Sequence, residues 1–181
     1  MADPTGPEAQ GHSLTEDPDA RLSGLAARLQ ALAIARGLTI GSAESCSGGL
    51  VGHAITSIPG SSAYYLGGVV SYADQAKRDL LGVSPATLEH HGAVSAQTAV
   101  AMAEGLRARL GCDLAVAVTG VAGPDGGTAA KPVGLSYVAV AGPTGHEVER
   151  HTWDGDRGAN KVSSAAAALA MLIATLERAG A

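Results

Sequence analysis

The chain has 181 residues, enough for one domain with a short appendage, and its 46% hydrophobic and 16% charged residues predict a soluble globular protein with a substantial core. It contains no Phe, one Trp and four Tyr, so small aliphatic side chains must fill that core. The net charge of −5 is carried by residues 1–20, and the neutral remainder, without a basic patch, excludes duplex nucleic acid as the main partner.

Residues 1–20 combine prolines and acidic side chains with few apolar ones, so we expect a disordered acidic tail there and a single domain over 21–181. The tail lacks the basic start and apolar stretch of a signal peptide. The run Ala165–Ala174 is too short to span a bilayer. Cys46 and Cys112 form no CxxC pair, which is typical of a reducing compartment. We therefore expect a cytoplasmic protein without membrane contact.

The first half of the domain predicts helices alternating with buried strands. A helix beginning near Arg21 has leucines at helical spacing and ends at Gly37, a typical C-cap. Ser84 and Ser95 are good N-caps for two later helices. The other elements expected here are a strand at 38–43, a helix at 48–58, a strand at 66–73 and an amphipathic stretch at 74–82.

The second half predicts a third buried strand and a late hairpin. Residues 113–120 form a nearly continuous apolar run, as in a strand covered on both faces. A glycine-rich loop follows, then two strands around the turn Pro143-Thr144-Gly145 and a last helix that Asp156 opens. These elements predict an α/β fold, a three-layer α/β/α sandwich with a mixed, mostly parallel sheet.

Three polar loops follow the first three predicted strands, at 42–49, 71–77 and 119–134. Ligands of open α/β sheets bind beyond the carboxyl ends of the strands, so these loops predict the site. The first loop offers two nucleophiles, Ser45 and Cys46, and a serine needs a base to accept its proton. No histidine lies on such a loop, and no metal-ligand spacing occurs, so we expect no metal.

Lysine is the alternative base, and Lys77 lies in the second loop, five residues after Tyr72. A lysine buried beside a phenol can lose enough pKa to act as a neutral amine near pH 7. The competing interpretation is a solvated lysine beside Asp74, with Tyr72 in the core. In the third loop, glycines would let backbone N–H groups approach an anion, and Arg157 at the start of the last helix would complete a phosphate site. An exposed arginine is the alternative.

The segments AESCSGG, PGSSAYYLGGVVSYADQAK, HGAVS, VTGVAGPDGG, KPVG and GDR, in this order and spacing, resemble the CinA C-terminal domain family, which includes stand-alone nicotinamide-nucleotide amidases. The resemblance covers about residues 22–178. It implies a three-layer fold with a mixed sheet and hydrolysis of nicotinamide mononucleotide to nicotinate mononucleotide and ammonia, a step of pyridine-nucleotide salvage. It places the catalytic serine, tyrosine and lysine on Ser45, Tyr72 and Lys77, and a threonine and an arginine of the nucleotide site on Thr119 and Arg157.

Taken together, residues and resemblance predict a cofactor-free amidase. Lys77 would accept the Ser45 proton, and Tyr72 would relay it or keep the lysine neutral. N–H groups near Ser47, Gly48 and Gly49 would bind the oxyanion. The groups expected to hold the ribose phosphate are Thr119, Gly123, Gly126 and Arg157.

We expect Cys46 to be a buried small hydrophobe. The family tendency implies a homo-oligomer, with the late edge strand and the last helix as contact surfaces. The alternative function, from another class, is a nucleotide-binding regulatory module with little turnover.

Overall fold

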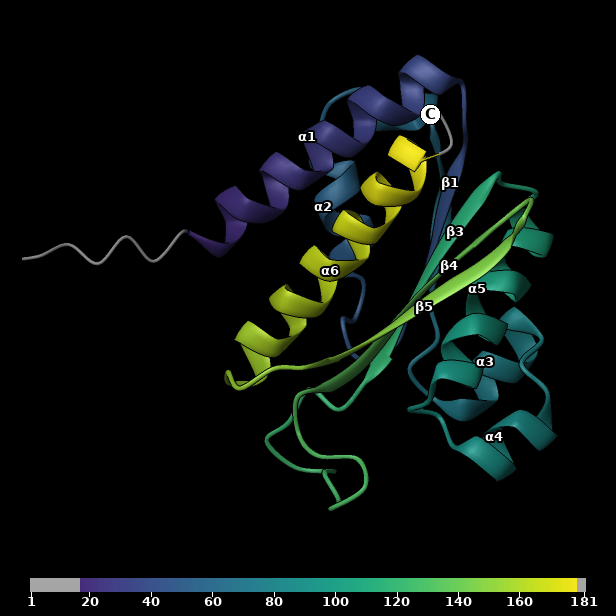
Figure 1. The fold of residues 1–181 in the computed structure, drawn as a ribbon, viewed down its shortest axis with the longest axis vertical. Helices are drawn as coiled ribbons and strands as arrows, with labels where there is room; N and C mark the ends of the chain where they lie inside the picture. Colours follow the sequence, from purple (N-terminus) through teal and green to yellow (C-terminus); the bar gives the residue numbers. More distant parts are fainter. Residues whose placement is uncertain (1–16, 179–181) are drawn as a thin grey trace, which may run out of the picture.

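A computed structural model describes residues 17–178, which form one five-stranded sheet in the order β2-β1-β3-β4-β5 (Figure 1). The strands are β1 (Ile40–Glu44), β2 (Tyr65–Val70), β3 (Leu114–Gly120), β4 (Leu135–Gly142) and β5 (Gly145–Thr152). β1 is parallel to both β2 and β3, while β4 is antiparallel to β3 and β5. Only β4 therefore runs against the common direction, which confirms the mixed, mostly parallel sheet.

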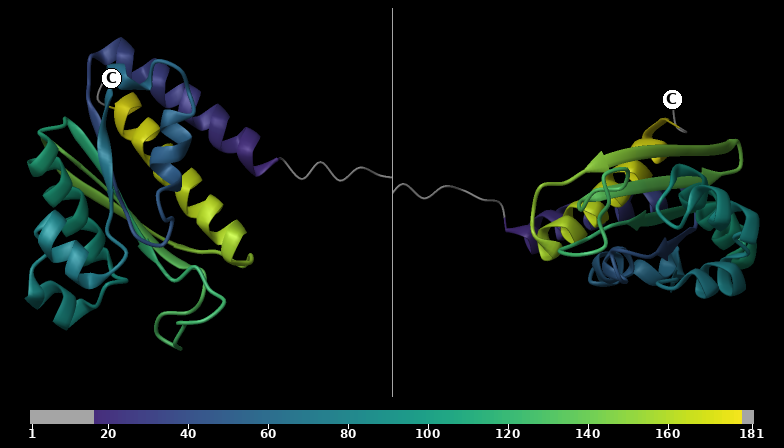
Figure 2. Two further views of the ribbon diagram at one scale, coloured as in Figure 1. Left: turned by 180° about the vertical axis from the view of Figure 1, so that it is seen from behind. Right: turned by 90° about the horizontal axis from the view of Figure 1, so that it is seen from below.

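Helices cover both faces of the sheet, as Figure 2 shows. One layer contains α1 (Pro18–Arg36), α2 (Leu50–Thr56) and α6 (Arg157–Arg178), and the other contains α3 (Asp74–Leu81), α4 (Pro85–His91) and α5 (Ala96–Leu110). The alternating side chains of β3 join the two cores, because Val116 and Val118 pack into the first and Ala115 and Ala117 into the second. The three-layer α/β/α prediction is confirmed.

The helix ends follow the capping residues read from the sequence. Ser84, Ser95 and Asp156 each accept a hydrogen bond from the backbone N–H three residues later, at the starts of α4, α5 and α6. Gly37 ends α1 in the left-handed conformation. α1 begins earlier than expected, at Pro18, because the Asp17 carboxylate caps the Asp19 N–H. Residues 18–20 are thus helical, and residues 1–16 of the expected tail lie outside the described residues.

Helix α6 is the one helix in residues 17–178 that is long and apolar enough, by length and composition, to cross a membrane. It has 22 residues, so it is much longer than the alanine-rich run on which the sequence argument relied. However, 56% of its most apolar 18-residue window is buried, against α1, α2 and the sheet. Core helices of soluble proteins pass the same test, and the packing identifies α6 as such a core helix.

The sheet topology brings the three predicted loops together. β1, β2 and β3 are neighbouring parallel strands, so their carboxyl ends share one edge of the sheet. At this edge β1 leads through Ser45 into α2, β2 leads through Tyr72 into α3, and β3 leads into the glycine-rich loop. The predicted site therefore lies where three chain segments meet.

Candidate active site

Ser45 occupies the turn between β1 and α2. Its backbone N–H donates to the Val118 carbonyl of the neighbouring strand at 2.9 Å, which extends the sheet by one residue and fixes the start of the turn. Gly48 and Gly49 then adopt positive φ angles of 65° and 97°, which only glycine adopts without strain. The result is a sharp strand-to-helix turn that holds the nearly buried Ser45 hydroxyl beside a cavity.

Lys77 reaches Ser45 from the first turn of α3. Its Nζ lies 3.2 Å from Ser45 Oγ, 3.0 Å from the Ser71 carbonyl oxygen and 3.2 Å from the Tyr72 carbonyl oxygen. The residue is 1% exposed, which is rare for a lysine and decides against the solvated interpretation. The structure thus brings together the nucleophile and the base proposed from the sequence.

The surroundings of Lys77 favour its neutral form. Burial lowers the pKa of its amine below the ordinary 10.5, and the carboxylate of Asp74, at 3.7 Å, opposes part of that shift. A neutral amine has two N–H groups and one lone pair. Lys77 Nζ is within donor distance of the Ser45 hydroxyl as well as of the two carbonyl oxygens. In the neutral form, the two carbonyl oxygens would accept the N–H groups and the lone pair would face the Ser45 hydroxyl. Geometry and burial agree on a lysine arranged to act as a base.

The Tyr72 side chain does not hold the lysine, contrary to the expectation from the sequence. Its backbone carbonyl contacts Lys77, whereas its phenol oxygen accepts a hydrogen bond from Arg157 Nη2 at 2.9 Å. Tyr72 is 59% exposed, and the second arm of Arg157 donates to the Gly123 carbonyl at 2.7 Å. Tyr72 and Arg157 therefore form a bridge across the edge of the site that links the second loop, the third loop and α6.

Glu44, directly before the nucleophile, is a functional residue that the sequence reasoning missed. Its buried carboxylate accepts hydrogen bonds from two hydroxyls and three backbone N–H groups. The donors are the hydroxyls of Ser42 and Ser47 and the N–H groups of Gly49, Val51 and Gly52. Glu44 therefore anchors the first turn of α2 and, with it, the loop that presents Ser45. A glutamate placed just before a glycine-rich helix start was the available signal.

This anchoring corrects part of the predicted oxyanion site. The Gly48 N–H donates to the Ser45 carbonyl at 3.0 Å. The Gly49 N–H and the Ser47 hydroxyl both donate to the Glu44 carboxylate. The backbone N–H groups of Cys46 and Ser47 donate to no oxygen of residues 17–178, but both lie close enough to the Cys46 sulfur to lower its thiol pKa against the larger effect of burial. Of the predicted donors, only the Ser47 amide is left to receive an oxyanion.

The surroundings of Cys46 disfavour it as the nucleophile. Its side chain is 6% exposed and joins the core on the α1, α2 and α6 side of the sheet. Burial raises the pKa of its thiol to about 11, so the reactive thiolate is scarce near neutral pH. Its behaviour is that of the expected buried small hydrophobe.

Two adjoining cavities open at this edge of the sheet. The first, of about 190 Å³, exposes the reactive groups, and its lining includes Ser45, Cys46, Tyr72, Asp74, Lys77, Ala93, Val94, Thr119, Gly120 and Ala122. The second, of about 530 Å³, shares Ala122 and is lined further by Pro124, Val133, Gly155, Asp156, Arg157 and Gly158. A small reacting group fits the first cavity, and a larger attached group fits the second.

The remaining predicted binding residues differ in their placement. Thr119 lines the first cavity, but its hydroxyl proton is donated to the Ala93 carbonyl at 2.7 Å. The carbonyl oxygen of Gly123, and not its N–H, faces Arg157 and accepts a hydrogen bond from it. An anion could bind between the two residues only if this hydrogen bond broke. Gly126 is exposed in the loop and lines neither cavity. The glycine-rich loop is thus not the anion cradle that we expected.

Lys161 is a second residue that the sequence reasoning left out. It follows Arg157 by one turn of α6, so the two cations lie on the same face of the helix. Its Nζ would lie 3.5 Å from a β-carbon placed on Gly48, which brings it beside the nucleophile turn. Arg157 lines the larger cavity and Lys161 lies beside the nucleophile turn, while Asp74 and Asp156 place one carboxylate in the wall of each cavity.

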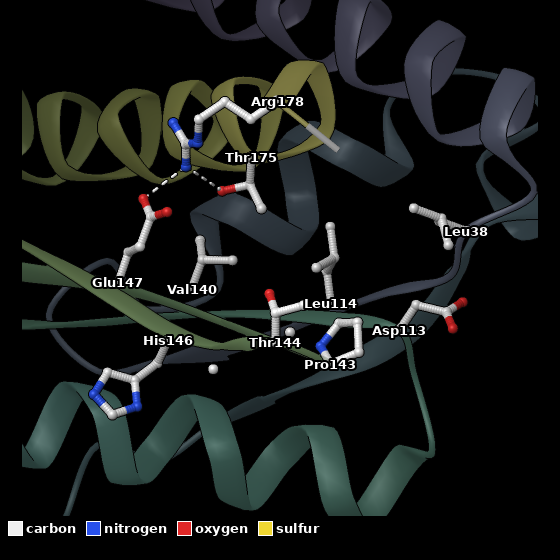
Figure 3. Close-up of a pocket in the computed structure, with 12 residues that line it drawn as sticks. Leu38, Asp113, Leu114, Val140, Pro143, Thr144, His146, Glu147, Thr175 and Arg178 are labelled. Atoms are coloured by element: carbon white, nitrogen blue, oxygen red, sulfur yellow. Dashed lines mark hydrogen bonds and ion pairs between the residues drawn. The ribbon is translucent and has the colours of Figure 1, made fainter. Parts of the chain in front are cut away.

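A further cavity, of about 490 Å³, lies at the other end of the strands, where β1 and β3 begin (Figure 3). It is bordered by Leu38, Leu114 and the β4–β5 turn, and Arg178 closes one side through an ion pair with Glu147. It contains no serine or cysteine and no lysine, and so no pair comparable to Ser45 and Lys77. Among residues 17–178, no three His, Cys, Asp or Glu side chains gather as metal ligands. The candidate site is therefore the one at the carboxyl ends of the strands.

Comparison with known proteins gives one consistent family. The family model of the CinA C-terminal domain matches residues 22–176. CinA-like proteins of Geotalea uraniireducens and Salinibacter ruber are 57% identical over 121 residues and 52% identical over 135 residues, covering 67% and 75% of this chain. These segments amount to 29% and 33% of the two relatives, so the chain spans about a third of their length.

Solved structures show the same fold. A competence/damage inducible protein from Agrobacterium tumefaciens is 44% identical, with a TM-score of 0.84 over 87% of this chain and 96% of that one. A competence-damaged protein (CinA) superfamily protein from Klebsiella pneumoniae is 34% identical, with the same TM-score over 87% of this chain and 98% of that one. The match covers nearly the whole length of both structures.

Proposed function

The chain belongs to the CinA C-terminal domain family, and we propose that it hydrolyses the carboxamide of nicotinamide mononucleotide to nicotinate mononucleotide and ammonia. The observation that carries the proposal is the 3.2 Å contact between Ser45 Oγ and a buried Lys77 whose other two partners are carbonyl oxygens. A serine hydroxyl beside a neutral amine is an activated nucleophile. No metal or cofactor takes part in the proposed reaction.

In the first step, Ser45 Oγ attacks the carbonyl carbon of the amide while its proton passes to Lys77 Nζ. The negative charge that develops on the amide oxygen is stabilised by the Cys46 and Ser47 N–H groups, which turn from the Cys46 sulfur to the oxyanion. Lys77 then returns the proton to the amide nitrogen. The C–N bond breaks, ammonia leaves, and the acyl group remains as an ester on Ser45.

In the second step, water hydrolyses the ester. Lys77, again neutral, accepts a proton from the water as its oxygen attacks the acyl carbon. Collapse of this intermediate breaks the bond to Ser45 Oγ and returns the proton to the serine. The products are a free hydroxyl, a neutral lysine and the carboxylic acid, which ionises in water. One water is consumed for each ammonia released.

The two adjoining cavities support a nucleotide rather than a free amide as substrate. The carboxamide enters the small cavity, and the ribose phosphate lies in the larger one toward α6. Arg157 and Lys161 provide the positive charge for the phosphate, and Arg157 exchanges its bond to the exposed Tyr72 phenol for bonds to the phosphate oxygens. Binding energy from this remote group orients the amide at Ser45.

The test is ammonia release from nicotinamide mononucleotide by the wild type and three variants. We expect Ser45→Ala and Lys77→Met to lose turnover while Cys46→Ala keeps it. Nicotinamide and other phosphorylated amides, assayed in parallel, separate this substrate from related ones. Full activity of Lys77→Met would contradict the mechanism, and activity on another amide alone would contradict the substrate.

The alternative function is a nucleotide-binding regulatory module with little turnover. Arg157 and the larger cavity would serve binding as well as catalysis. Calorimetry distinguishes the two, because the module binds the nucleotide tightly but releases no ammonia from it. The buried lysine favours the enzyme, since a binding module has no need of a buried amine next to a serine.

A further inference from the structure

The first cavity carries a negative charge that the reacting amide does not explain. Among the ten described residues that line it, Asp74 has the only carboxylate. Lys77 and Cys46 also line it, but burial favours their neutral forms, because it lowers the pKa of the lysine and raises that of the thiol to about 11. A carboxamide is neutral and the carboxylate product is an anion, so neither is attracted by the Asp74 carboxylate. A different part of the ligand is needed to match this charge.

Asp74 lies at the start of α3, close to the reacting groups. One of its carboxylate oxygens is 3.7 Å from Lys77 Nζ, and that nitrogen is 3.2 Å from Ser45 Oγ. The two contacts keep the carboxylate nearer to the nucleophile than about 8 Å, the distance over which physiological salt screens charges. Because the Asp74 side chain is 58% exposed, a ligand in the cavity can reach it.

We propose that Asp74 is a specificity-determining residue, which selects an amide carried on a positively charged ring. The inference rests on the proposed function, because the ring of nicotinamide mononucleotide is a pyridinium with a permanent positive charge. The carboxamide is attached directly to this ring, so an amide carbon in contact with Ser45 Oγ brings the ring to the same cavity as Asp74. An opposite charge there stabilises the bound cation, whereas a neutral ring gains nothing from it.

The charges of the two cavities match those of this ligand in order and in sign. The first cavity offers the Asp74 carboxylate to the ring, and the larger one offers the Arg157 guanidinium to the phosphate. Asp156 also borders the larger cavity, but its carboxylate accepts the Ala159 N–H at 2.8 Å and caps α6. α3 has no side-chain cap, so the Asp74 carboxylate is left for the ligand.

The test compares two ligands that differ in the charge of the ring. The reduced mononucleotide has a neutral dihydropyridine ring and keeps the carboxamide, the ribose and the phosphate. Asp74 also acts on Lys77 and on the start of α3, but those effects are the same for both ligands and cancel in the ratio of their Kd values. Ser45→Ala is the background for calorimetry, because it leaves the amide intact.

Ser45→Ala should bind the oxidised mononucleotide about fivefold more tightly than the reduced one, the size expected of a partly exposed ion pair. Adding Asp74→Asn should bring this ratio close to one, and adding Asp74→Glu should preserve it. Adding Asp79→Asn, an equal loss of charge farther along α3, should leave the ratio unchanged.

The outcomes separate this inference from the function on which it rests. A ratio close to one in Ser45→Ala, or a ratio that survives Asp74→Asn, would overturn the inference and leave the proposed function intact. If Ser45→Ala bound neither nucleotide, the proposed substrate would be wrong and the inference would fall with it.

Discussion

Glu44 and Ser45 are neighbours in the chain, yet their side chains differ in how many hydrogen bonds they form and in whether they border a cavity. The Glu44 carboxylate accepts five hydrogen bonds and faces the start of α2. The Ser45 hydroxyl has one partner, Lys77, and borders a cavity. Because successive residues of an extended strand point to opposite faces, one residue can anchor the turn while the next presents the reactive group.

The difference shows how the fold separates stability from chemistry. A buried charge with all its hydrogen bonds made rigidifies its surroundings. The Lys77 amine is buried and its nearest carboxylate, that of Asp74, is 3.7 Å away, so its charged form is unfavourable. Burial therefore favours the neutral amine, which can accept a proton. We infer that Glu44 keeps the turn rigid, and that this rigidity holds Ser45 in place beside Lys77.

The largest expected effect is the loss of turnover on removal of either reactive group. Ser45→Ala or Lys77→Met should lower kcat on the proposed substrate by about 10³-fold or more, since nucleophile and base act as one unit. Both variants should still fold, although Lys77→Met leaves the carbonyl oxygens of Ser71 and Tyr72 without their donor and should lower the free energy of unfolding by about 1–3 kcal/mol. Denaturant unfolding of the same samples is the control, and a folded but fully active variant would disprove the pairing.

The next effect falls on stability. Glu44→Gln places an amide NH₂ against the N–H groups that the carboxylate now accepts, and should lower the free energy of unfolding by about 1–3 kcal/mol. Glu104→Gln, an equal change at an exposed position, should change it by less than about 0.5 kcal/mol. Urea titration of both variants gives the comparison. Equal stability of the two would mean that the buried carboxylate anchors nothing.

A smaller effect is expected on substrate binding. Arg157→Gln should raise KM for the mononucleotide about tenfold, the size expected for a lost charged hydrogen bond, and leave KM for any unphosphorylated amide unchanged. Lys161→Gln should act in the same direction. Arg28→Gln removes an equal charge from α1 and serves as the control for long-range effects. A KM that rises equally for both substrates would place Arg157 outside the phosphate site.

The smallest effect is a shift of the pH profile. The carboxylate of Asp74 favours the protonated lysine and so raises the pKa of Lys77 against the larger effect of burial. Asp74→Asn should therefore lower that pKa further. Because the neutral amine is the active form, the acid limb of the rate profile should move to lower pH. Asp79→Asn, on the same helix, should leave the limb in place, and a shift in the opposite direction would exclude Lys77 as the base.

Much of this could be predicted from sequence because local signals determined it. The capping residues Ser84 and Ser95, the apolar run of β3 and the order of polar loops are local features, and they gave the layers and the meeting of the three loops. The pairing of Ser45 with Lys77 came from the family resemblance, because the residues alone left a solvated Lys77 open. All five donors to Glu44 lie within eight residues of it, so its anchoring role had a local signal that the prediction did not use. The Tyr72 phenol, by contrast, contacts Arg157, 85 residues away. Contacts of that kind depend on tertiary packing, to which no local pattern corresponds.

The central claim is that Lys77 is neutral where it contacts Ser45, and titration of the lysine side chains by NMR tests it most directly. The sequence has three lysines, so Lys77→Met identifies the signal without ambiguity. We predict that one of the three titrates well below 10.5 and that this signal is absent from the variant. If all three titrate near the ordinary value, the buried-base account is contradicted.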